Sequence, residues 1–503
     1  MVTRVREDAQ GVPAGIVREV QNFIAGSWQA VEAAGVAGAR SATEPVYNPA
    51  SGEVIARTPL SPASEVNRAV VAASEAFPHW SALPVAARTD VLFRFRGLLA
   101  EHVEELAALV TLENGKDLKD ARGEVRRGLE VVDFACGMPT LLMGETVRNV
   151  AQGIDNVSYR FPLGVVAAIT PFNFPFMVPL WTLPIAIGAG NTYILKPSER
   201  TPLSALRIVD LLQEAGLPQG VVNIVNGAKD VVDGILDHPG IKAVSFVGSQ
   251  PVAEYVYRRG AAHNKRVQAL SGAKNSMIVM PDADLAPTLD TVMSAVFGNA
   301  GERCLAGSVL VAVGEIADPL VDALTTRASA MKVGPGSEPD SELTPLIRES
   351  HRERVRGYID LGEQEGATVA VDGRTPPRED GFFLGPTLLD HVTPEMRVAR
   401  EEIFGPVLSI VRVKDLDEAI AFVNGSRFGN ACSLFTRSGS AARVFRERAG
   451  AGMLGINVGV AAPMAFFPFN GIKDSFYGDL HVTGKDGVRF FTENRVEIMR
   501  WFS

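Results

Sequence analysis

The chain of 503 residues contains few cysteines and histidines, three and seven respectively. Cys136, Cys304 and Cys432 lie far apart in the sequence, so they form neither a disulfide framework nor metal-ligand spacing. The histidines do not cluster either. We therefore expect no bound metal, and we expect free thiols that suit a reducing compartment, the cytoplasm.

Basic residues are not in excess, because 49 Lys and Arg face 58 Asp and Glu, for a net charge of -9. This balance disfavours nucleic acid and anionic membranes as partners and leaves a small molecule as the expected one. Residues 1–8 carry charges with no apolar stretch after them, which disfavours a secretory signal. An anionic substrate would need local arginines.

A long uncharged run covers residues 161–195 and could in principle span a bilayer. Proline interrupts it at Pro162, Pro171, Pro175, Pro179 and Pro184. Because proline breaks helices, the run is better interpreted as a buried strand, a pocket wall, a short helix and a second buried strand.

The chain is longer than the length at which a single hydrophobic core stops growing, so we expect at least two domains. The pattern predicts helices over 88–115 and 116–136. It then predicts strands over 164–170, 192–196, 221–225 and 243–247, with helices over 202–215 and 231–236 between them. Such alternation is typical of a doubly wound parallel sheet. A second α/β block begins near residue 274, with strands predicted over 276–280, 309–313, 408–413 and 432–436.

Cys304 lies among small residues in the run 298–308, after a predicted helix over 288–297. A thiol placed there could be a nucleophile, although many free cysteines are ordinary buried residues. Two other runs favour the nucleophile, Thr-Pro-Phe-Asn-Phe-Pro at 170–175 and Glu-Ile-Phe-Gly-Pro-Val at 402–407.

Together these three runs resemble the aldehyde dehydrogenase superfamily. Further similar runs follow the same order at 23–28, 196–199, 216–218, 246–249 and 468–473. The resemblance implies an α/β fold with three parts. These are a Rossmann-like NAD-binding domain (1–146 and 161–273), an α/β catalytic domain (274–480) and a small oligomerisation β-sheet (147–160 and 481–503), with a last strand over 487–502. It also implies a homotetramer, a dimer of dimers, although the sequence leaves dimer against tetramer open.

The usual dinucleotide fingerprint Gly-x-Gly-x-x-Gly follows no predicted strand. The resemblance instead implies that NAD contacts Thr170, Phe172, Lys196, Glu199, Gly248, Ser249, Glu402 and Phe404. Gly248 and Ser249 would hold the pyrophosphate at a helix start, and Glu199 beside the adenosine ribose would favour NAD over NADP. In isolation Lys196 and Glu199 fit a solvated turn, and Phe404 fits a core aromatic. Ala253 replaces a family glycine, and its methyl group could crowd the cofactor.

The resemblance assigns the chemistry to Cys304, which would attack an aldehyde, and to Asn173. The Asn173 side-chain amide and the Cys304 backbone N–H would stabilise the oxyanion, at about 3–4 kcal/mol per donor. Hydride loss to NAD would then leave a thioester on the cysteine. In isolation Asn173 fits a turn residue between two prolines.

Leu270 decides the fate of that thioester. Aligned on Gly272 and Lys274, it occupies the position where hydrolytic family members keep a glutamate general base. A leucine accepts no proton, so water attack loses a factor of roughly 10²–10⁴, whereas a thiol acceptor ionises more easily. The chain thus resembles the CoA-acylating branch, and within it the methylmalonate-semialdehyde dehydrogenases. The supporting runs are 123–130, 142–146, 457–460, 463–469 and 475–480.

In that branch the substrate carries a carboxylate, and Arg127 and Arg303 are the candidates to bind it. Arg303 could also lower the pKa of the adjacent thiol. Arg127 could instead lie on a solvated helix face, as we expect of Arg126. The implied reaction converts methylmalonate or malonate semialdehyde, NAD and CoA into propionyl-CoA or acetyl-CoA with loss of the carboxylate.

Two alternatives remain open in the sequence. One is a hydrolytic dehydrogenase for a small carboxylated aldehyde, and the other is a non-catalytic relative that keeps the NAD site. The second draws on departures from the family pattern at Ala253 and at Gly307, where a larger residue is usual. The sequence does not assign CoA-binding residues, a group that assists decarboxylation, the preferred semialdehyde or the pathway.

Overall fold

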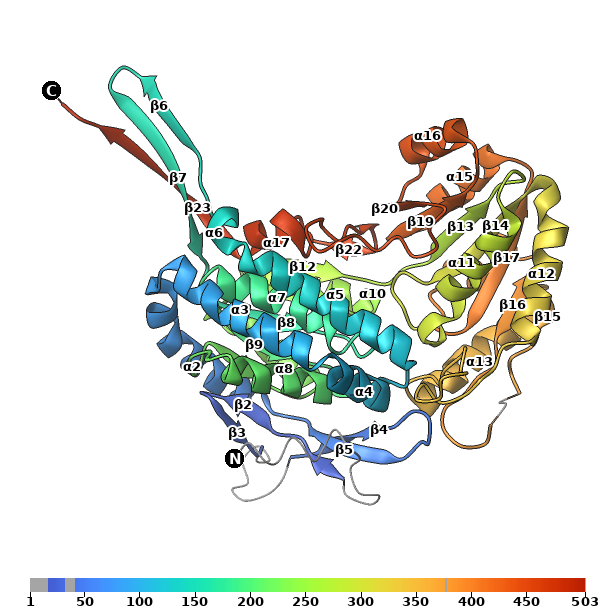
Figure 1. Cartoon of the computed structure of the whole chain (residues 1–503), viewed down its shortest axis with the longest axis horizontal. Helices are drawn as coiled ribbons and strands as arrows, with labels where there is room; N and C mark the ends of the chain where they lie inside the picture. Colours follow the sequence, from blue (N-terminus) through green and yellow to red (C-terminus); the bar gives the residue numbers. More distant parts are fainter. Residues whose placement is uncertain (1–16, 32–40, 376–377, 503) are drawn as a thin grey trace.

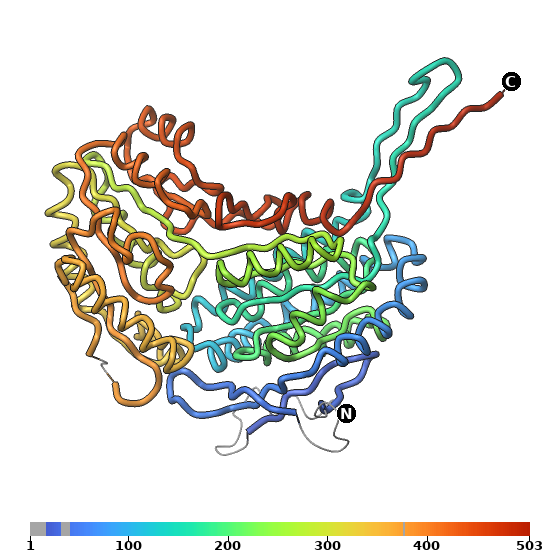
Figure 2. Tube along the Cα trace, turned by 180° about the vertical axis from the view of Figure 1, so that it is seen from behind, coloured from blue at the N-terminus to red at the C-terminus, as the bar shows by residue number. Residues whose placement is uncertain are grey.

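The computed structural model describes residues 17–31, 41–375 and 378–502. Figure 1 shows two α/β lobes side by side and a narrow arm of strands that projects from the first lobe. The view from behind shows that the last part of the chain crosses from the second lobe along the first and ends in the arm (Figure 2). In the described part of the chain, no helix is both long and apolar enough to cross a bilayer.

The first lobe is built on an eight-stranded sheet in the order β22-β12-β11-β8-β9-β10-β2-β3. Its bounds are β2 (Asn22–Ile24), β3 (Ser27–Gln29), β8 (Val165–Ile169), β9 (Thr192–Lys196), β10 (Val222–Ile224), β11 (Ile241–Val247), β12 (Arg266–Leu270) and β22 (Phe476–Tyr477). The strands from β12 to β10 run parallel. Since Ile169 pairs with Phe246 and Lys196, the carboxyl ends of β8, β9 and β11 meet at one edge, where α/β folds bind ligands.

Helices cover both faces of this sheet. They are α2 (Ala63–Ala82), α3 (Val85–Glu101), α4 (Val103–Asn114), α5 (Leu118–Cys136), α6 (Met138–Leu141), α7 (Met177–Gly188), α8 (Leu203–Glu214), α9 (Lys229–Asp237), α10 (Gln250–Ala262) and α17 (Gly484–Phe490). Buried residues of α3, α5, α7 and α8 form one core cluster, and those of α2, α9 and α10 form another. The doubly wound arrangement predicted from the strand and helix pattern is therefore confirmed.

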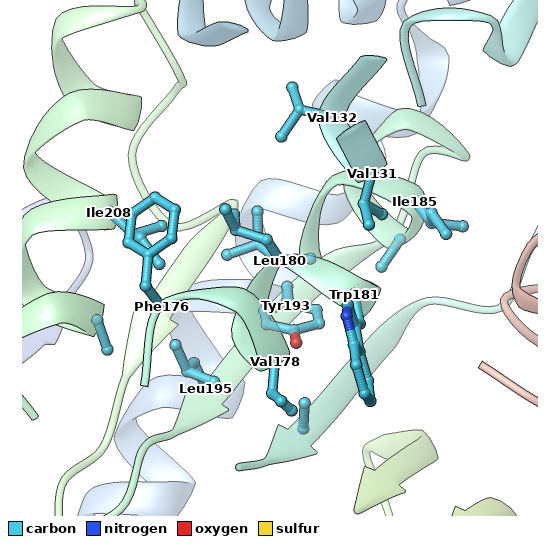
Figure 3. Packing of buried hydrophobic residues seen from close by; sticks show 14 of the residues in the cluster. Val131, Val132, Phe176, Val178, Leu180, Trp181, Ile185, Tyr193, Leu195 and Ile208 are labelled. Atoms are coloured by element: carbon cyan, nitrogen blue, oxygen red, sulfur yellow. The ribbon is translucent and has the colours of Figure 1, made fainter. Parts of the chain in front are cut away.

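The uncharged run 161–195 forms the centre of the first core cluster. It folds into the end of β7, then β8, α7 and β9, and every residue of α7 after Met177 is buried. Figure 3 shows Leu180 and Trp181 of α7 among side chains of α5, α8 and β9. A helix that is apolar on all sides needs such a position, so the run is core rather than a membrane span.

The second lobe contains a seven-stranded sheet in the order β15-β16-β17-β14-β13-β19-β20, antiparallel only at β15. Its strands are β13 (Asn275–Val279), β14 (Gly307–Val313), β15 (Thr368–Val371), β16 (Thr387–Asp390), β17 (Val407–Val413), β19 (Ala431–Phe435) and β20 (Met453–Ile456). Its helices are α11 (Leu285–Phe297), α12 (Ala317–Ser329), α13 (Glu349–Gln364), α14 (Arg397–Arg400), α15 (Leu416–Gly425) and α16 (Gly439–Arg448).

Three smaller sheets complete the fold. The first contains β1 (Arg18–Glu19), β4 (Thr43–Tyr47) and β5 (Val54–Pro59), and the second β18 (Phe428–Gly429) and β21 (Ile472–Lys473). The projecting arm contains β6 (Thr146–Ala151), β7 (Ile154–Pro162) and β23 (Thr492–Arg500). In the arm, β23 pairs with β7 along its whole length, although the two are far apart in the sequence.

The structure differs from the predicted elements in three places. The helix predicted over 88–115 is two helices, because His102 leaves the helical conformation between α3 and α4. The last strand begins at Thr492 rather than at 487, since α17 precedes it. Finally, the segment from Ala465 to Phe491 packs into the first core cluster, and β22 extends the first sheet. Part of this returning segment is therefore buried against the first lobe, and the predicted bounds 274–480 of the catalytic domain stay a prediction.

Candidate active site

Two cavities meet at the thiol of Cys304. The first, here the arginine cavity, measures about 510 Å³ and contains Arg127 and Arg303 in its wall. The second, here the lysine cavity, measures about 760 Å³ and contains Lys196 at the carboxyl edge of the first sheet. Cys304 lines both cavities. A molecule in either cavity can therefore approach the same sulfur atom.

The loop that carries Cys304 is tightly constrained. After α11, Asn299 and Ala300 adopt left-handed conformations with φ of 51° and 52°. Asparagine tolerates this region, but alanine costs roughly 1–2 kcal/mol there, so the surrounding contacts must hold the turn. The carbonyl oxygen of Cys304 accepts hydrogen bonds from the side-chain amides of Asn275 at 3.0 Å and Asn430 at 2.9 Å. These contacts fix the nucleophile loop to strand β13 and to the segment before β19.

Asn173 is 4% exposed and is fixed at both its side chain and its backbone. Its Nδ2 donates to the carbonyl oxygen of Glu302 at 2.8 Å, two residues before the thiol. Its own carbonyl oxygen accepts from Lys116 Nζ at 2.7 Å and from Asn299 Nδ2 at 3.4 Å. An amide nitrogen has two hydrogens, so one N–H of Asn173 remains for an oxyanion.

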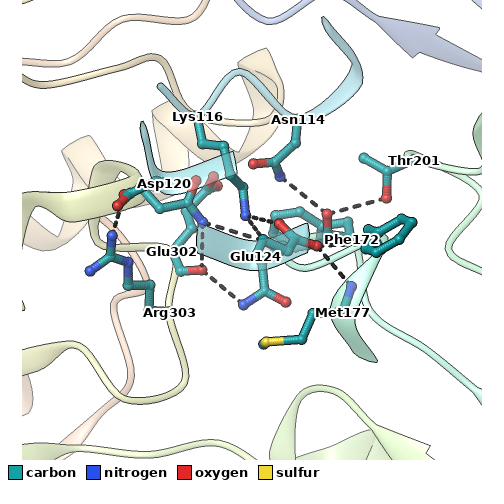
Figure 4. Close-up of polar contacts among 12 residues, drawn as sticks. Asn114, Lys116, Asp120, Glu124, Phe172, Met177, Thr201, Glu302 and Arg303 are labelled. Atoms are coloured by element: carbon teal, nitrogen blue, oxygen red, sulfur yellow. Dashed lines mark hydrogen bonds and ion pairs between the residues drawn. The ribbon is translucent and has the colours of Figure 1, made fainter. Parts of the chain in front are cut away.

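Lys116 and Glu124, which the sequence analysis did not single out, form a buried pair (Figure 4), and Lys116 contacts the backbone of Asn173. Lys116 Nζ lies 2.6 Å from Glu124 Oε2, and both side chains are fully buried. Glu124 Oε1 accepts from the backbone N–H groups of Phe176 at 2.9 Å and Met177 at 3.1 Å, at the start of α7. One carboxylate thus orders a helix start and, through Lys116, the backbone of Asn173. Lys116 lies before the first residue of α5 and Glu124 lies on that helix, so helical periodicity gives no signal that the two side chains pair.

Loss of Glu124 should be strongly destabilising. We expect Glu124→Leu to lower the free energy of unfolding by about 3–5 kcal/mol, because Lys116 would remain buried without its partner. The double variant Lys116→Met with Glu124→Leu should recover part of that loss, since it removes both charges. Urea unfolding measures both effects. Glu130→Gln is the matched control, since Glu130 is a partly exposed member of a pair on the same helix, and it should change stability by less than about 1 kcal/mol.

The thiol is protonated at neutral pH in this structure. Burial and the nearby carboxylate of Glu402 raise the pKa of Cys304 to about 12. Arg303 acts in the opposite direction but more weakly, and it forms an ion pair with Asp120. Arg303 therefore lowers the pKa of the thiol as expected, but desolvation outweighs this adjacent cation, so the net pKa of Cys304 is raised in the free protein.

In the lysine cavity, the expected adenosine-ribose ligands form a pair at the end of β9. Lys196 Nζ lies 2.9 Å from Glu199 Oε2, with the side chains 6% and 24% exposed. The alternative of a solvated turn is therefore wrong for these two residues. Gly248 and Ser249 lie at the start of α10 and also line this cavity, together with Thr170 and Phe172.

Glu402 and Phe404 lie across the lysine cavity from that pair, on the second lobe. Glu402 Oε1 accepts from the backbone N–H of Ala273 at 3.0 Å, and burial raises the pKa of its carboxyl group to about 6. Gly272 permits this position, since a Cβ atom there would lie 2.7 Å from Glu402 Oε2. Phe404 is partly exposed in the cavity, with its ring 5.9 Å from that of Phe172, so it is not a core aromatic.

The two departures from the family pattern have structural explanations. Ala253 is fully buried in the core cluster beneath α10 and does not line the lysine cavity, so its methyl group does not crowd that space. At Gly307, a Cβ atom would lie 2.4 Å from Met277 Sδ on the neighbouring strand. The side chain of Met277 therefore fills the volume that a larger residue at 307 would occupy.

The arginine cavity contains both arginines expected to bind a carboxylate. Arg303 pairs with Asp120, and Arg127 Nη1 lies 2.9 Å from Glu130 Oε2. Arg127 is therefore not simply on a solvated helix face, although each guanidinium already has one acidic partner. Arg126 also reaches this cavity but is exposed.

Leu270 is 4% exposed at the end of β12, within the core cluster against which Cys304 packs. It contributes no titratable group to either cavity. Among the described residues, no group of three or more His, Cys, Asp or Glu side chains could hold a metal ion.

The chain belongs to the aldehyde dehydrogenase family, whose model matches residues 36–496. It is therefore an oxidoreductase. Among curated relatives, it is 55% identical to the malonate-semialdehyde dehydrogenase of Halalkalibacterium halodurans over 96% of this chain and 98% of that protein. The methylmalonate-semialdehyde dehydrogenase of Oceanimonas doudoroffii superposes with a TM-score of 0.93 at 48% identity, covering 97% of this chain and 99% of that one.

A structure described as the NAD⁺ complex of an aldehyde dehydrogenase from Bacillus cereus is also similar. It has a TM-score of 0.91 at 32% identity, over 99% of this chain and 98% of that chain. The aldehyde dehydrogenase fold and the resemblance to semialdehyde dehydrogenases are thereby confirmed.

Proposed function

We propose that the protein converts methylmalonate semialdehyde or malonate semialdehyde, NAD and CoA into propionyl-CoA or acetyl-CoA through a thioester on Cys304. The observation that carries the proposal is the position of this thiol, between a cavity with two arginines and a cavity suited to a dinucleotide. Leu270 in place of a general base supports CoA rather than water as the acyl acceptor. The names of the similar enzymes support the substrate class.

The lysine cavity fits NAD by the chemistry of its residues. The Lys196–Glu199 pair offers a cation and an acceptor for ribose hydroxyls, and the start of α10 offers backbone N–H groups near Gly248 for a pyrophosphate. Glu402 offers a carboxylate for the second ribose. When bound, NAD accepts the hydride from the aldehyde carbon.

Side chains and backbone groups of the protein carry out the other steps. Cys304 gives up its proton to solvent water and its sulfur bonds to the aldehyde carbon, while Asn173 Nδ2 and the Cys304 backbone N–H bind the new oxyanion. Loss of hydride from that carbon leaves the thioester. The carboxylate β to it departs as CO₂, and the resulting enolate takes a proton. The CoA thiol finally attacks the thioester, so that acyl-CoA leaves and the Cys304 thiol is restored.

Product analysis tests the proposal. The semialdehyde and NAD are mixed with and without CoA, NADH is followed by absorbance and acyl products are identified by mass. We expect steady turnover to propionyl-CoA only with CoA, and a single stoichiometric burst of NADH without it. Steady formation of a free acid without CoA would instead support the hydrolytic alternative.

Arg303 and Arg127 are proposed to bind the carboxylate of the semialdehyde. We expect Arg303→Ala to lower kcat/KM for the semialdehyde by about 10²–10³-fold, since a charge-assisted bidentate contact is lost. Arg127→Ala should have a smaller effect in the same direction, and Arg126→Ala, the exposed neighbour, should have almost none. Steady-state kinetics with propionaldehyde, which lacks the carboxylate, provides the control. If Arg303→Ala impaired both aldehydes equally, Arg303 would not be a carboxylate ligand.

We also propose that the arm mediates assembly of the chain into a homotetramer, as a dimer of dimers. Its strands expose apolar side chains at Val147, Val150, Val496 and Ile498, the last being 68% exposed. The edge of β20 in the second sheet has no partner strand among the described residues. A second copy of this chain can therefore pair its arm with such an edge.

Charge on the arm should disrupt this assembly. We expect the double variant Val496→Arg, Ile498→Arg to elute as a single chain in light scattering, whereas the wild type should be a dimer or tetramer. Val71→Arg, at a 49% exposed site on α2, is the matched control and should leave the mass unchanged. A monomeric wild type would refute the proposed role of the arm.

The free thiols support a location in the reducing cytoplasm.

A further inference from the structure

Glu302 is a buried carboxyl group that the proposed chemistry does not use, although it lies two residues before the nucleophile. Its carbonyl oxygen accepts hydrogen bonds from the amides of Asn173 at 2.8 Å and Asn299 at 3.2 Å. Its side chain is 0% exposed, and Oε1 accepts from the backbone N–H of Ile347 at 3.3 Å. The backbone of Glu302 therefore holds the oxyanion amide, while its side chain points to a different part of the second lobe.

That side chain reaches His351, which lines the lysine cavity at the start of α13. His351 Nε2 lies 3.4 Å from Glu302 Oε1 and 2.7 Å from the carbonyl oxygen of Phe404. The imidazole ring also makes edge contacts with the rings of Phe172 and Phe404, with centroids 6.4 Å and 6.3 Å apart. His351 thus contacts both aromatic side chains that are expected to contact NAD.

Phe404 needs such a contact because its backbone is strained. Its φ of 60° lies in the left-handed region, which a bulky aromatic residue rarely adopts. Conformations of this kind persist only when the surroundings fix them. From the side of α13, His351 donates to the Phe404 carbonyl oxygen itself, and Arg354 donates to the carbonyl oxygens of Ile403 at 2.6 Å and Glu402 at 2.8 Å.

Both groups are neutral near pH 7. Burial raises the pKa of Glu302 to about 8 and lowers that of His351 to about 4, with Lys116, Arg200, Arg348 and Arg354 as the surrounding cations. The 3.4 Å contact is therefore one between a protonated acid and a neutral imidazole rather than an ion pair. Because the contact between Glu302 and His351 is neutral, it places no fixed charge near the nicotinamide ring that receives the hydride.

We propose that Glu302 and His351 are positioning residues that fix the Phe404 ring and the Asn173 amide in one rigid unit with the Cys304 loop. Their role is to set the geometry between the thiohemiacetal carbon and the nicotinamide during hydride transfer. This geometry must hold to a fraction of an ångström. Misplacement of the Phe404 ring or the Asn173 amide therefore slows hydride transfer rather than the later attack by CoA. The inference rests on the proposed function, since it assumes that Cys304 carries the thiohemiacetal.

The test measures hydride transfer directly. Single-turnover bursts of NADH are recorded without CoA, using semialdehyde with hydrogen or deuterium at the aldehyde carbon. We expect Glu302→Ala and His351→Phe to slow the burst by roughly 10–100-fold and to enlarge the deuterium isotope effect. Glu302→Gln, which keeps a neutral acceptor of the same shape, and His351→Gln, which keeps an N–H donor, should remain within about threefold of the wild type. His391→Phe, at an exposed histidine on the second lobe, is the matched control.

Three outcomes would overturn the inference. Wild-type burst rates in both Glu302→Ala and His351→Phe would show that the Phe404 ring and the Asn173 amide need no support from Glu302 and His351. Equal damage in Glu302→Gln and Glu302→Ala would show that the acid acts as an ion. A slower burst with an unchanged isotope effect would indicate damage to an earlier step. If Glu302→Ala fails to fold, the comparison of His351→Phe with His351→Gln carries the test alone. A wild type without any burst would refute the proposed function itself.

Discussion

Cys304→Ala should lower NADH formation from methylmalonate semialdehyde by about 10⁴-fold or more, because no other described side chain at the junction of the two cavities can form the thioester. Cys136→Ala and Cys432→Ala are the matched controls. Both cysteines are buried in core clusters and line neither cavity. Steady-state assays with all three variants, at saturating NAD and CoA, measure the effect. Substantial activity in Cys304→Ala would exclude a thioester mechanism.

The same residue gives a second readout that is independent of substrate. Since burial raises the pKa of Cys304 to about 12, the thiolate fraction should grow tenfold per pH unit up to at least pH 10. Iodoacetamide alkylation followed by peptide mass analysis should show this rise at Cys304. Cys432, whose pKa is also raised to about 12, is 1% exposed and should remain unmodified. A plateau near pH 8 would show that the thiol of the free protein is already activated.

The sequence predicted most of the fold because buried parallel strands are short apolar runs between helices. β9 has the predicted bounds, and β8, β11, β14 and β19 lie within about two residues of theirs. The predictions from sequence failed where tertiary contacts determine the local secondary structure. His102 breaks a periodic helix, and the segment before β23 is helical because Val488 and Phe490 are buried against the first lobe.

For the site, the sequence predicted the residues that carry distinctive chemistry but not those that hold them. Cys304, Asn173 and both arginines line the two cavities, and their roles stay predictions. Lys116 lies just before α5 and Glu124 lies on that helix, and their role depends on α7 packing beside α5. A charged residue in a polar segment of sequence gives no sign that it is buried. The support that Lys116 and Glu124 give to Asn173 is therefore evident only from the structure, in which α5 and α7 pack together.

The pKa of the thiol shows the same limit. From sequence, Arg303 next to Cys304 indicated a lowered value, because an adjacent cation stabilises a thiolate. In the fold, Asp120 pairs with that arginine, and burial dominates. Adjacent residues in a chain are not necessarily each other's electrostatic environment, since partners from other helices can intervene.

Leu270→Glu should convert the protein toward hydrolysis. We expect the rate of NADH formation without CoA to rise by about 10²–10⁴-fold after the first turnover, because a carboxylate at this position can take a proton from the attacking water. The site is 4% exposed, so the new carboxyl group should have a raised pKa and act best near or above neutral pH. Product mass should change from propionyl-CoA to propionate.

Leu270→Gln is the control for this variant, because glutamine is similar in size and polarity but accepts no proton. Both substitutions place a polar group in an apolar cluster, so urea unfolding should show similar losses of stability. Only the glutamate should support turnover without CoA. If the two variants hydrolyse the thioester equally, water access rather than a missing base protects the acyl enzyme. CoA dependence would then be a property of the shape around Cys304, and Leu270 would matter because it excludes water from the thioester.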